Sequence, residues 1–201
     1  MQESPLGAEI FTGGSEQSIG DSVVLGILTV SDRASAGTYE DLSGPAIIDF
    51  FDQALDSKWT AHYLCVPDER AEIERALLAL CDEIKCSVVV TTGGTSPAKR
   101  DITPEATLAV GERIMEGFGE QMRAISLRYT PTAILSRQVG VTRGNSLIFN
   151  LPGRPKAIRE TIDEIWRAVP YCVDLLEGPY IECKPEVCEA FRPKNAIRQT
   201  G

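Results

Sequence analysis

The sequence lacks the long apolar run that a membrane-spanning helix requires. No stretch of about 18 consecutive apolar residues occurs among the 201 residues. The N-terminal stretch MQESPLGAEIFTGGSEQSIGDS also lacks the basic start and apolar core of a secretory signal. We therefore expect a cytoplasmic protein, with residues 1–21, rich in Gly, Ser and Glu, as a flexible N-terminal extension.

Histidine is almost absent, since His62 is the only one. The chain also contains no GxSxG, no GxxxxGK[ST] and no GxGxxG motif. These absences argue against Ser/His/Asp hydrolysis, P-loop ATP hydrolysis and Rossmann hydride transfer. Because His62 falls within a predicted strand, we interpret it as a packed or edge residue.

The cysteines form neither a CxxC motif nor a Cys/His cluster. Their spacing does not suit zinc, and a chain of this length does not need disulfides. We expect reduced, mostly buried thiols at positions 65, 81, 86, 172, 183 and 188.

The formal net charge is −9, which argues against general nucleic-acid binding. The charge is uneven, because residues 99–159 carry a net charge of +5 and the rest of the chain −14. A basic middle within an acidic protein suits a small anion bound locally. Some of these arginines are also expected simply to lie on solvated helix faces.

Apolar, β-branched runs predict strands over residues 23–30, 60–66, 86–92 and 146–151. Helical spacing and start signals predict helices that follow Ser43, Asp68 and Thr103 as caps, and two more over 120–127 and from Lys156 to about Ala168. A short strand or hairpin is expected near residues 133–141, and an irregular chain over 179–201. This alternation predicts a three-layer α/β/α fold with a mostly parallel sheet, as a single domain over residues 22–195 with a tail at 196–201.

Four polar motifs follow the predicted strands: SDR, PDE, TTGGT and NLPGRP. Because ligands of parallel α/β sheets bind at the carboxyl ends of the strands, these motifs should line one edge. The glycines of TTGGT allow backbone N–H groups to point at an anion, although Gly-Gly is also common in plain turns.

Asp68 and Asp101 each lie just past a predicted strand end. Two carboxylates beside a phosphate loop suit Mg²⁺, which takes one or two protein carboxylates and completes its shell with water and phosphate. Asp68 could instead cap a helix, and Asp101 could form a surface ion pair with Lys99 or Arg100. Asn150 could offer its amide to a heterocycle, or the NLPGRP segment could be a rigid connection.

Together these features suit phosphoryl or nucleotidyl transfer, in which positioning and charge neutralisation supply most of the catalysis.

The chain resembles the molybdopterin adenylyltransferases, colinearly from about residue 23 to 195. The resemblance lies in the blocks GILTVSDRASAGTYEDLSG, VPDERAEIERAL, TTGGTSPAKRDITPEAT, GFGEQMRAISL, PTAILSRQVGV, NLPGRPKAIRE and VPYCVDLLEGPY. Related domains occur in molybdenum insertases and in gephyrin.

The resemblance implies a homotrimer that transfers AMP from ATP to the terminal phosphate of molybdopterin with Mg²⁺, releases pyrophosphate and passes the product to a molybdenum insertase. It implies that Asp68 and Asp101 are the catalytic and metal-binding acids. It also implies substrate-binding or nucleotide-binding roles for Ser31, Asp32, Thr92, Gly93, Gly94, Thr95, Ser126, Ser136, Arg137, Asn150, Pro152 and Gly153.

One position departs from the family pattern, since Ser96 stands where the family often has Gly. A Ser in a left-handed conformation would cost about 1 kcal/mol. The alternative functions are molybdate insertion, for which the chain is short, a non-catalytic molybdopterin carrier or scaffold, and a generic nucleotide-binding protein.

Overall fold

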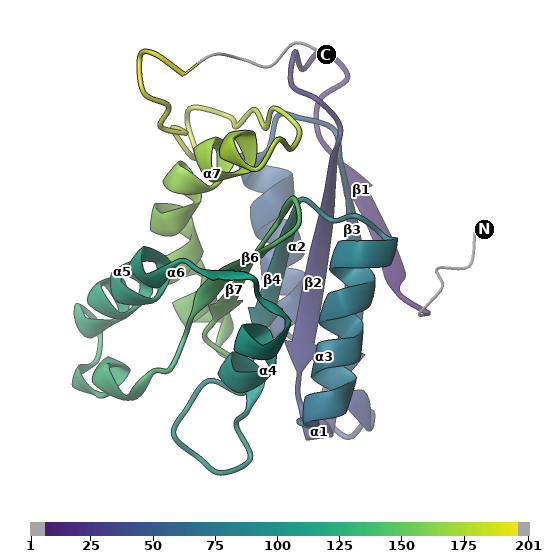
Figure 1. Cartoon of the computed structure of the whole chain (residues 1–201), viewed down its shortest axis with the longest axis vertical. Coiled ribbons are helices and arrows are strands. Elements are labelled where there is room, and N and C mark those ends of the chain that lie inside the picture. Colours follow the sequence, from purple (N-terminus) through teal and green to yellow (C-terminus); the bar gives the residue numbers. More distant parts are fainter. Residues whose placement is uncertain (1–6, 197–201) are drawn as a thin grey trace.

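The computed structural model describes residues 7–196. In that part of the chain seven strands form one sheet, and helices cover both of its faces (Figure 1). This confirms the three-layer α/β/α architecture predicted from the sequence. None of the described helices is long and apolar enough to cross a membrane.

The sheet has the strand order β1-β3-β2-β4-β7-β6-β5. The four strands β3, β2, β4 and β7 run parallel, whereas β1 at one side and β6 and β5 at the other pair antiparallel. The prediction of a mostly parallel sheet is therefore only partly right, because a parallel centre has antiparallel flanks. The strands are β1 (Glu9–Gly13), β2 (Val23–Val30), β3 (Trp59–Val66), β4 (Val88–Thr92), β5 (Arg113–Ile114), β6 (Gly140–Arg143) and β7 (Ser146–Leu151).

The helices alternate with the central strands. They are α1 (Asp32–Ser35), α2 (Ser43–Ala54), α3 (Arg70–Leu78), α4 (Thr103–Val110), α5 (Glu116–Leu127), α6 (Pro155–Ile165) and α7 (Val169–Leu175). A π-helical turn, Ala79–Glu83, extends α3, and short 3-10 helices occupy Pro131–Leu135 and Trp166–Ala168. The hairpin predicted near 133–141 is misplaced: Pro131 starts a 3-10 helix there, and the β6–β7 hairpin begins only at Gly140.

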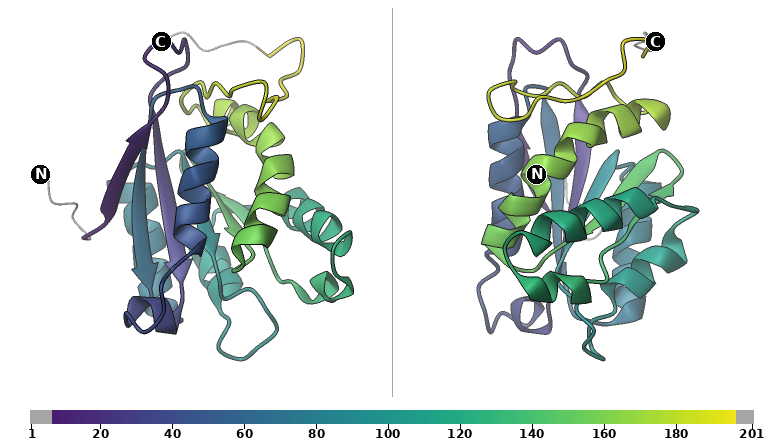
Figure 2. Two further views of the ribbon diagram at one scale, coloured as in Figure 1. Left: turned by 180° about the vertical axis from the view of Figure 1, so that it is seen from behind. Right: turned by 90° about the vertical axis from the view of Figure 1, so that its left-hand side faces the viewer.

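Two apolar clusters hold the layers together. On one face α2, α5, α6 and α7 pack on the sheet around Phe50, Phe51 and Trp166, and the view from behind in Figure 2 shows α2 and α6 over this face. On the other face α3 and α4 pack on the sheet around Ile73 and Val89. Because the central strands are covered on both faces, they carry continuous apolar runs rather than an alternating pattern.

The N-terminal segment is more ordered than the sequence suggests. Residues 1–6 of the expected flexible extension lie outside the described residues, but Glu9–Gly13 forms β1, which pairs antiparallel with β3. Residues further along also bond to the main fold, as where the backbone N–H of Ser15 donates to the carbonyl of Asp56 at 2.8 Å. At the other end, no helix or named strand occurs over residues 179–196, as expected, and 197–201 lie outside the described part.

The predicted caps differ from the observed ones. Ser43 and Thr103 are the first residues of α2 and α4 rather than caps, and α3 has Glu69 at its cap without a side-chain bond. The amide donors that start α2 are bonded by Asp41, whose carboxylate accepts from Ser43 at 2.8 Å and from Gly44 at 3.0 Å. Since Glu69 occupies the cap position of α3, Asp68 does not cap that helix.

Candidate active site

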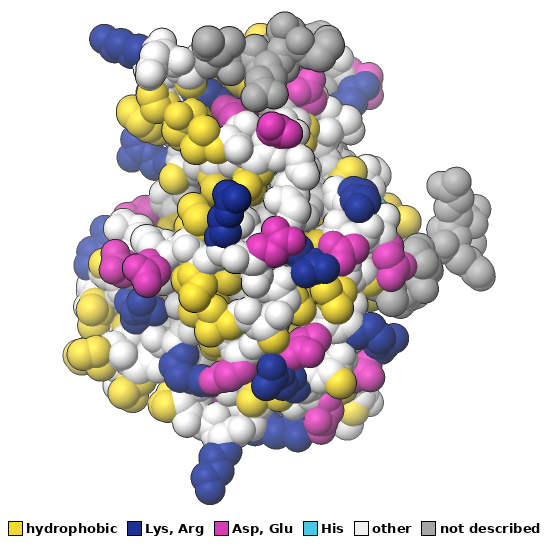
Figure 3. Space-filling view, viewed as in Figure 1, with side chains coloured by type: hydrophobic (Ala, Val, Ile, Leu, Met, Phe, Trp, Pro, Cys, Tyr) yellow, Lys and Arg dark blue, Asp and Glu magenta, His cyan; other side chains and the backbone are white. Residues whose placement is uncertain are grey.

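The four strand-end motifs meet at one edge of the sheet, as predicted. β2, β3, β4 and β7 are mutually parallel, so the segments that follow Val30, Val66, Thr92 and Leu151 emerge on the same side. In Figure 1 this is the lower end, where α1 follows β2 and the long loop between β4 and α4 projects. Figure 3 shows Lys and Arg intermixed with Asp and Glu over this end.

Asp32 and Asp68 link the ends of β2 and β3. The backbone N–H of Asp32 donates to the Asp68 carboxylate, and the backbone N–H of Asp68 donates to the Asp32 carboxylate. Burial, reinforced by the negative charges of Asp32 and Asp101, raises the pKa of Asp68. Hydrogen bonds from Arg100 and from the Asp68 backbone lower the pKa of Asp32.

Arg100 is committed to the same cluster. Its guanidinium donates to both oxygens of Asp32, at 2.9 and 3.0 Å, and to Glu69 at 2.8 Å. Asp101 therefore does not form the ion pair with Arg100 that was its alternative role. Lys99 carries no ion pair to any carboxylate in the described part of the chain, so its charge remains available to an anion.

The loop that follows β4 needs glycine at two successive positions. Gly93 and Gly94 have φ angles of 93° and 61°, in the left-handed region that side chains rarely adopt. A Cβ on Gly93 would lie 2.3 Å from the carbonyl oxygen of Val30, and one on Gly94 would lie 2.3 Å from Thr103 Oγ1. The backbone can therefore follow this path only without side chains, which suits close approach to a phosphate.

Ser96 does not carry the strain that its departure from the family pattern suggested. Its φ is not positive, and its hydroxyl accepts the Ala98 N–H at 3.2 Å. Its own N–H donates to Asp101 Oδ2 at 2.8 Å. Asp101 is thereby held against the loop by one oxygen.

Arg137 fastens this loop to the segment after α5. Its backbone N–H donates to the Thr95 carbonyl at 3.0 Å and its Nε to the Ser96 carbonyl at 2.8 Å, while the guanidinium also contacts the Asp101 carbonyl and Glu105. The resemblance gave Arg137 a binding role. The structure shows it occupied in holding the loop.

A cavity of about 430 Å³ adjoins the loop. Its lining combines Thr95 and Ser96 with Ser126 and Ser136 from the segment 126–138, and with Pro152 and Gly153 from the end of β7. Five predicted site residues, which lie in three separate segments of the sequence, thus surround one space together with Ser96. Gln138 and Arg154 also line it, although neither is predicted as a site residue from the sequence.

Three other predicted site residues turn inward. Asn150 is fully buried, and its amide donates to Thr91 and Thr107, both at 2.9 Å, and accepts from the Val139 backbone at 3.2 Å. Thr92 Oγ1 donates to the Pro152 carbonyl at 2.7 Å, and Ser31 caps α1 by accepting from Ala34. These side chains shape the site from beneath, and the amide of Asn150 is not presented to the cavity.

The donor set suits Mg²⁺ better than a metal that needs a closed protein cage. Among the described residues no group of three or more His, Cys, Asp or Glu side chains forms a metal centre. Asp68 and Asp101 each use one oxygen, Oδ2, to accept a backbone N–H, and Asp68 Oδ1 lies close to Gly94, 3.2 Å from where a Cβ on that residue would be. Two carboxylates with crowded negative charge match a cation that takes most of its ligands from phosphate and water.

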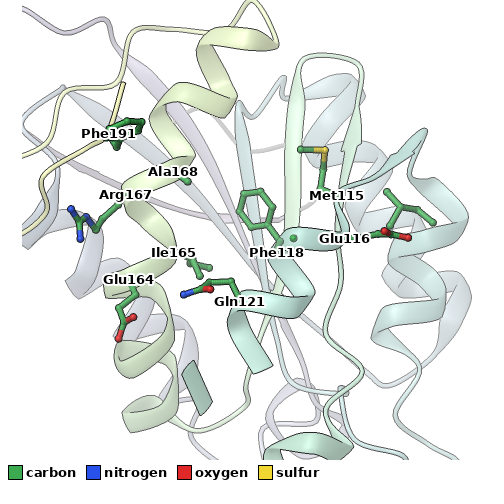
Figure 4. A pocket seen from close by; sticks show the side chains of 11 residues that line it. Met115, Glu116, Phe118, Gln121, Glu164, Ile165, Arg167, Ala168 and Phe191 are labelled. Atoms are coloured by element: carbon green, nitrogen blue, oxygen red, sulfur yellow. The ribbon is translucent and has the colours of Figure 1, made fainter. Parts of the chain in front are cut away.

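A larger cavity, of about 600 Å³, lies elsewhere, between the start of α5 and the end of α6. Figure 4 shows Phe118 and Gln121 facing Ile165 and Ala168 across it. Its lining is largely apolar and includes none of the strand-end residues. His62, midway along β3, is half-buried and also remote from the strand ends, as the sequence indicated.

Comparisons with known proteins find relatives along most of the chain. Residues 26–171 match the model of a family described as "probable molybdopterin binding domain". The molybdopterin adenylyltransferase of Escherichia coli (strain K12) is 53% identical over 189 residues, covering 88% of this chain and 97% of that protein. The one of Helicobacter pylori (strain J99) is 53% identical over 173 residues, covering 86% and 98%. Among solved structures, the molybdopterin biosynthesis enzyme MoaB of Thermus thermophilus matches with a TM-score of 0.72 and 38% identity, covering 79% of this chain and 99% of that one.

Proposed function

Since the chain belongs to the family of molybdopterin-binding domains, we propose that the edge built by Asp32, Asp68 and Asp101 binds ATP and that the adjoining 430 Å³ cavity binds molybdopterin. The chain is an enzyme of molybdenum cofactor biosynthesis, with the adenylyl-transfer activity for which its curated relatives are named. The proposal rests on the position of the loop 93–101, which borders both the acidic edge and the cavity.

The reaction requires little proton transfer. An oxygen of the terminal phosphate of molybdopterin attacks the α-phosphorus of ATP, a new P–O bond forms, the bond to the bridging oxygen breaks, and pyrophosphate leaves. The attacking phosphate is already ionised at neutral pH, so no general base is needed. A site without histidine is therefore competent, and catalysis rests on positioning and charge neutralisation.

The residues of the loop and edge supply those two effects. The backbone N–H groups around Gly93 and Gly94 would donate to phosphate oxygens, and Lys99, which forms no ion pair in the described part of the chain, lies further along the same loop. Asp68 and Asp101 would hold Mg²⁺ through their oxygens that accept no backbone N–H, and a bound ion would supply positive charge to the phosphates. Arg137 holds the loop next to the cavity by donating to the Ser96 carbonyl.

Ser126, Ser136, Pro152 and Gly153 line the space that receives the pterin. The resemblance further supports a homotrimer and transfer of the product to a molybdenum insertase, and both belong to the proposal. The six cysteines are free thiols, four of them buried. A cytoplasmic location, whose reducing conditions keep thiols free, also belongs to the proposal.

The test is direct. Purified protein is mixed with molybdopterin, ATP and Mg²⁺, and adenylylated molybdopterin is followed by mass together with released pyrophosphate. Both products in equal amounts are expected. Tight molybdopterin binding without either product would instead indicate a carrier or scaffold protein, and ATP binding without molybdopterin binding would indicate a generic nucleotide-binding protein.

A further inference from the structure

Gln138 is a buried glutamine beside the cavity whose amide is bonded at both ends. The residue is 1% exposed. Nε2 donates to the backbone carbonyl of Asn150 at 3.0 Å, and Oε1 accepts from the Ser136 hydroxyl at 2.7 Å. Gln138 thus connects a residue of the cavity wall to the sheet.

The Asn150 carbonyl fixes which way round the Gln138 amide lies. A carbonyl oxygen only accepts, so the NH₂ end of Gln138 must face it. The weak acceptor Met122 Sδ, 3.8 Å from Nε2, agrees with that orientation. The amide oxygen consequently faces Ser136.

This orientation determines the direction of the bond to Ser136. An amide oxygen cannot donate, so the single hydroxyl proton of Ser136 must be given to Gln138. One lone pair of Ser136 Oγ faces the Gln138 backbone N–H, at 3.5 Å, and one remains. Toward the cavity Ser136 therefore offers an acceptor and no donor.

We propose that Gln138 is a positioning residue that makes Ser136 a hydrogen-bond acceptor, and that Ser136 accepts from an N–H of the pterin. The inference rests on the proposed function, which places the pterin in this cavity. A pterin has N–H groups on its rings and on its amino substituent, so it can supply the donor. Gln138 has a positioning role and not a binding role in this proposal, because each end of its amide is already bonded and the residue is 1% exposed.

The test is a double-mutant cycle on molybdopterin affinity. Dissociation constants for molybdopterin and for ATP are measured for the wild type, Ser136→Ala, Gln138→Leu and the double variant. Each single substitution is expected to weaken molybdopterin binding about 3- to 10-fold, the range that one neutral hydrogen bond supplies. The double variant is expected to bind no more weakly than Ser136→Ala, since Gln138 acts only through Ser136. ATP affinity is expected to stay unchanged in all four proteins.

Controls separate this role from general support of the fold. Gln138→Met, which keeps the length of the side chain, should repeat the effect of Gln138→Leu, and Ser136→Thr, which keeps the hydroxyl, should restore binding. Gln53→Leu changes an exposed glutamine at the far end of α2 and should have no effect.

The proposal is overturned if Gln138→Leu and Gln138→Met leave molybdopterin affinity unchanged. It is also overturned if their effect persists in the Ser136→Ala background, or if ATP affinity falls in parallel. If the wild-type protein binds ATP but not molybdopterin, both the proposed function and this inference are wrong. The wild-type measurement alone shows that result, so it is distinguished from a failure of the inference only.

Discussion

Asp32 and Asp68 each donate a backbone N–H to the other's carboxylate, over distances of 2.9 and 3.0 Å. This reciprocal pair joins the ends of two neighbouring strands and fixes both side chains. The bond from Asp32 uses Oδ2 of Asp68, whereas Oδ1 lies beside the glycine loop. One oxygen of Asp68 therefore serves the fold, and the other is the one that we propose to serve the substrate and its metal.

Asp68→Asn should remove catalysis while the fold is kept, because the amide oxygen can still accept the Asp32 N–H. We expect turnover to fall by about 10²–10³-fold, the usual cost of losing one electrostatic contact to a transition state. Molybdopterin binding should persist. Asp101→Ala should behave alike, and Asp52→Asn, an exposed acid on α2, serves as the control. Survival of turnover in both the Asp68 and Asp101 variants would show that neither acid is catalytic.

The pKa shifts predict opposite effects of two similar substitutions on stability. The raised pKa of Asp68 means that the folded state binds its proton more tightly, so this residue lowers the free energy of unfolding as pH rises above its ordinary pKa of 3.8. Asp68→Asn should accordingly raise Tm at neutral pH, and the gain should vanish in acid. Thermal unfolding scans between acidic and neutral pH give both curves.

Asp32 has a lowered pKa, so its contribution is stabilising above its ordinary pKa of 3.8 and is lost as pH falls through the lowered value. Asp32→Asn should lower Tm at neutral pH. Equal signs for the two variants would contradict the electrostatic description of the edge.

Gly94→Ala should damage activity more than stability. The added Cβ would lie 2.3 Å from Thr103 Oγ1 and 3.2 Å from Asp68 Oδ1, so the loop or Asp68 must move. A displacement of that kind can cost about a hundredfold in turnover. Gly144→Ala is the matched control, since Gly144 also has a positive φ, of 51°, but nothing lies within 4 Å of its added Cβ. Similar turnover losses in both variants would mean that backbone strain alone is responsible.

Arg154→Ala should weaken molybdopterin binding. Arg154 lines the cavity, and no carboxylate in residues 7–196 pairs with it, so its charge is free to contact the anionic end of the ligand. We expect about a tenfold rise in the dissociation constant at low salt, typical of a charged hydrogen bond. The difference from the wild type should narrow as ionic strength rises, because salt screens exposed charges. Arg75→Ala, on α3, is the control, and a salt-independent difference would contradict the assignment.

The sequence predicts the elements whose burial dictates their composition. The strand predicted over 23–30 coincides with β2 and the one over 146–151 with β7, because both are covered on two faces and read as unbroken apolar runs. β1 was missed because an edge strand is held through its backbone and needs no such run. The cap of α2 was assigned to Ser43, since the sequence does not show that Asp41 folds back to reach it.

The site was predictable where chain order alone brings residues together. Parallel strands carry their ends to one edge, so the meeting of Asp32, Asp68 and the glycine loop followed from topology. The burial of the Asn150 amide and the bonds of Gln138 could not be predicted. They depend on the hydrogen-bond partners that side chains and backbone find within the segment 136–150, which chain order does not determine. Similarly, the sequence could not show that Arg100 forms its ion pairs with Asp32 and Glu69 and not with Asp101.

β1 also has a consequence for self-association. It covers the outer edge of β3, and the opposite edge of the described sheet is β5, only two residues long. Shortening the chain to begin after Gly20 would uncover Trp59–Tyr63, the five residues of β3 that now pair with β1, as an open edge. An uncovered edge of that length is a template onto which other chains can add strands and aggregate. Removal of β1 is therefore expected to promote association of chains through this edge.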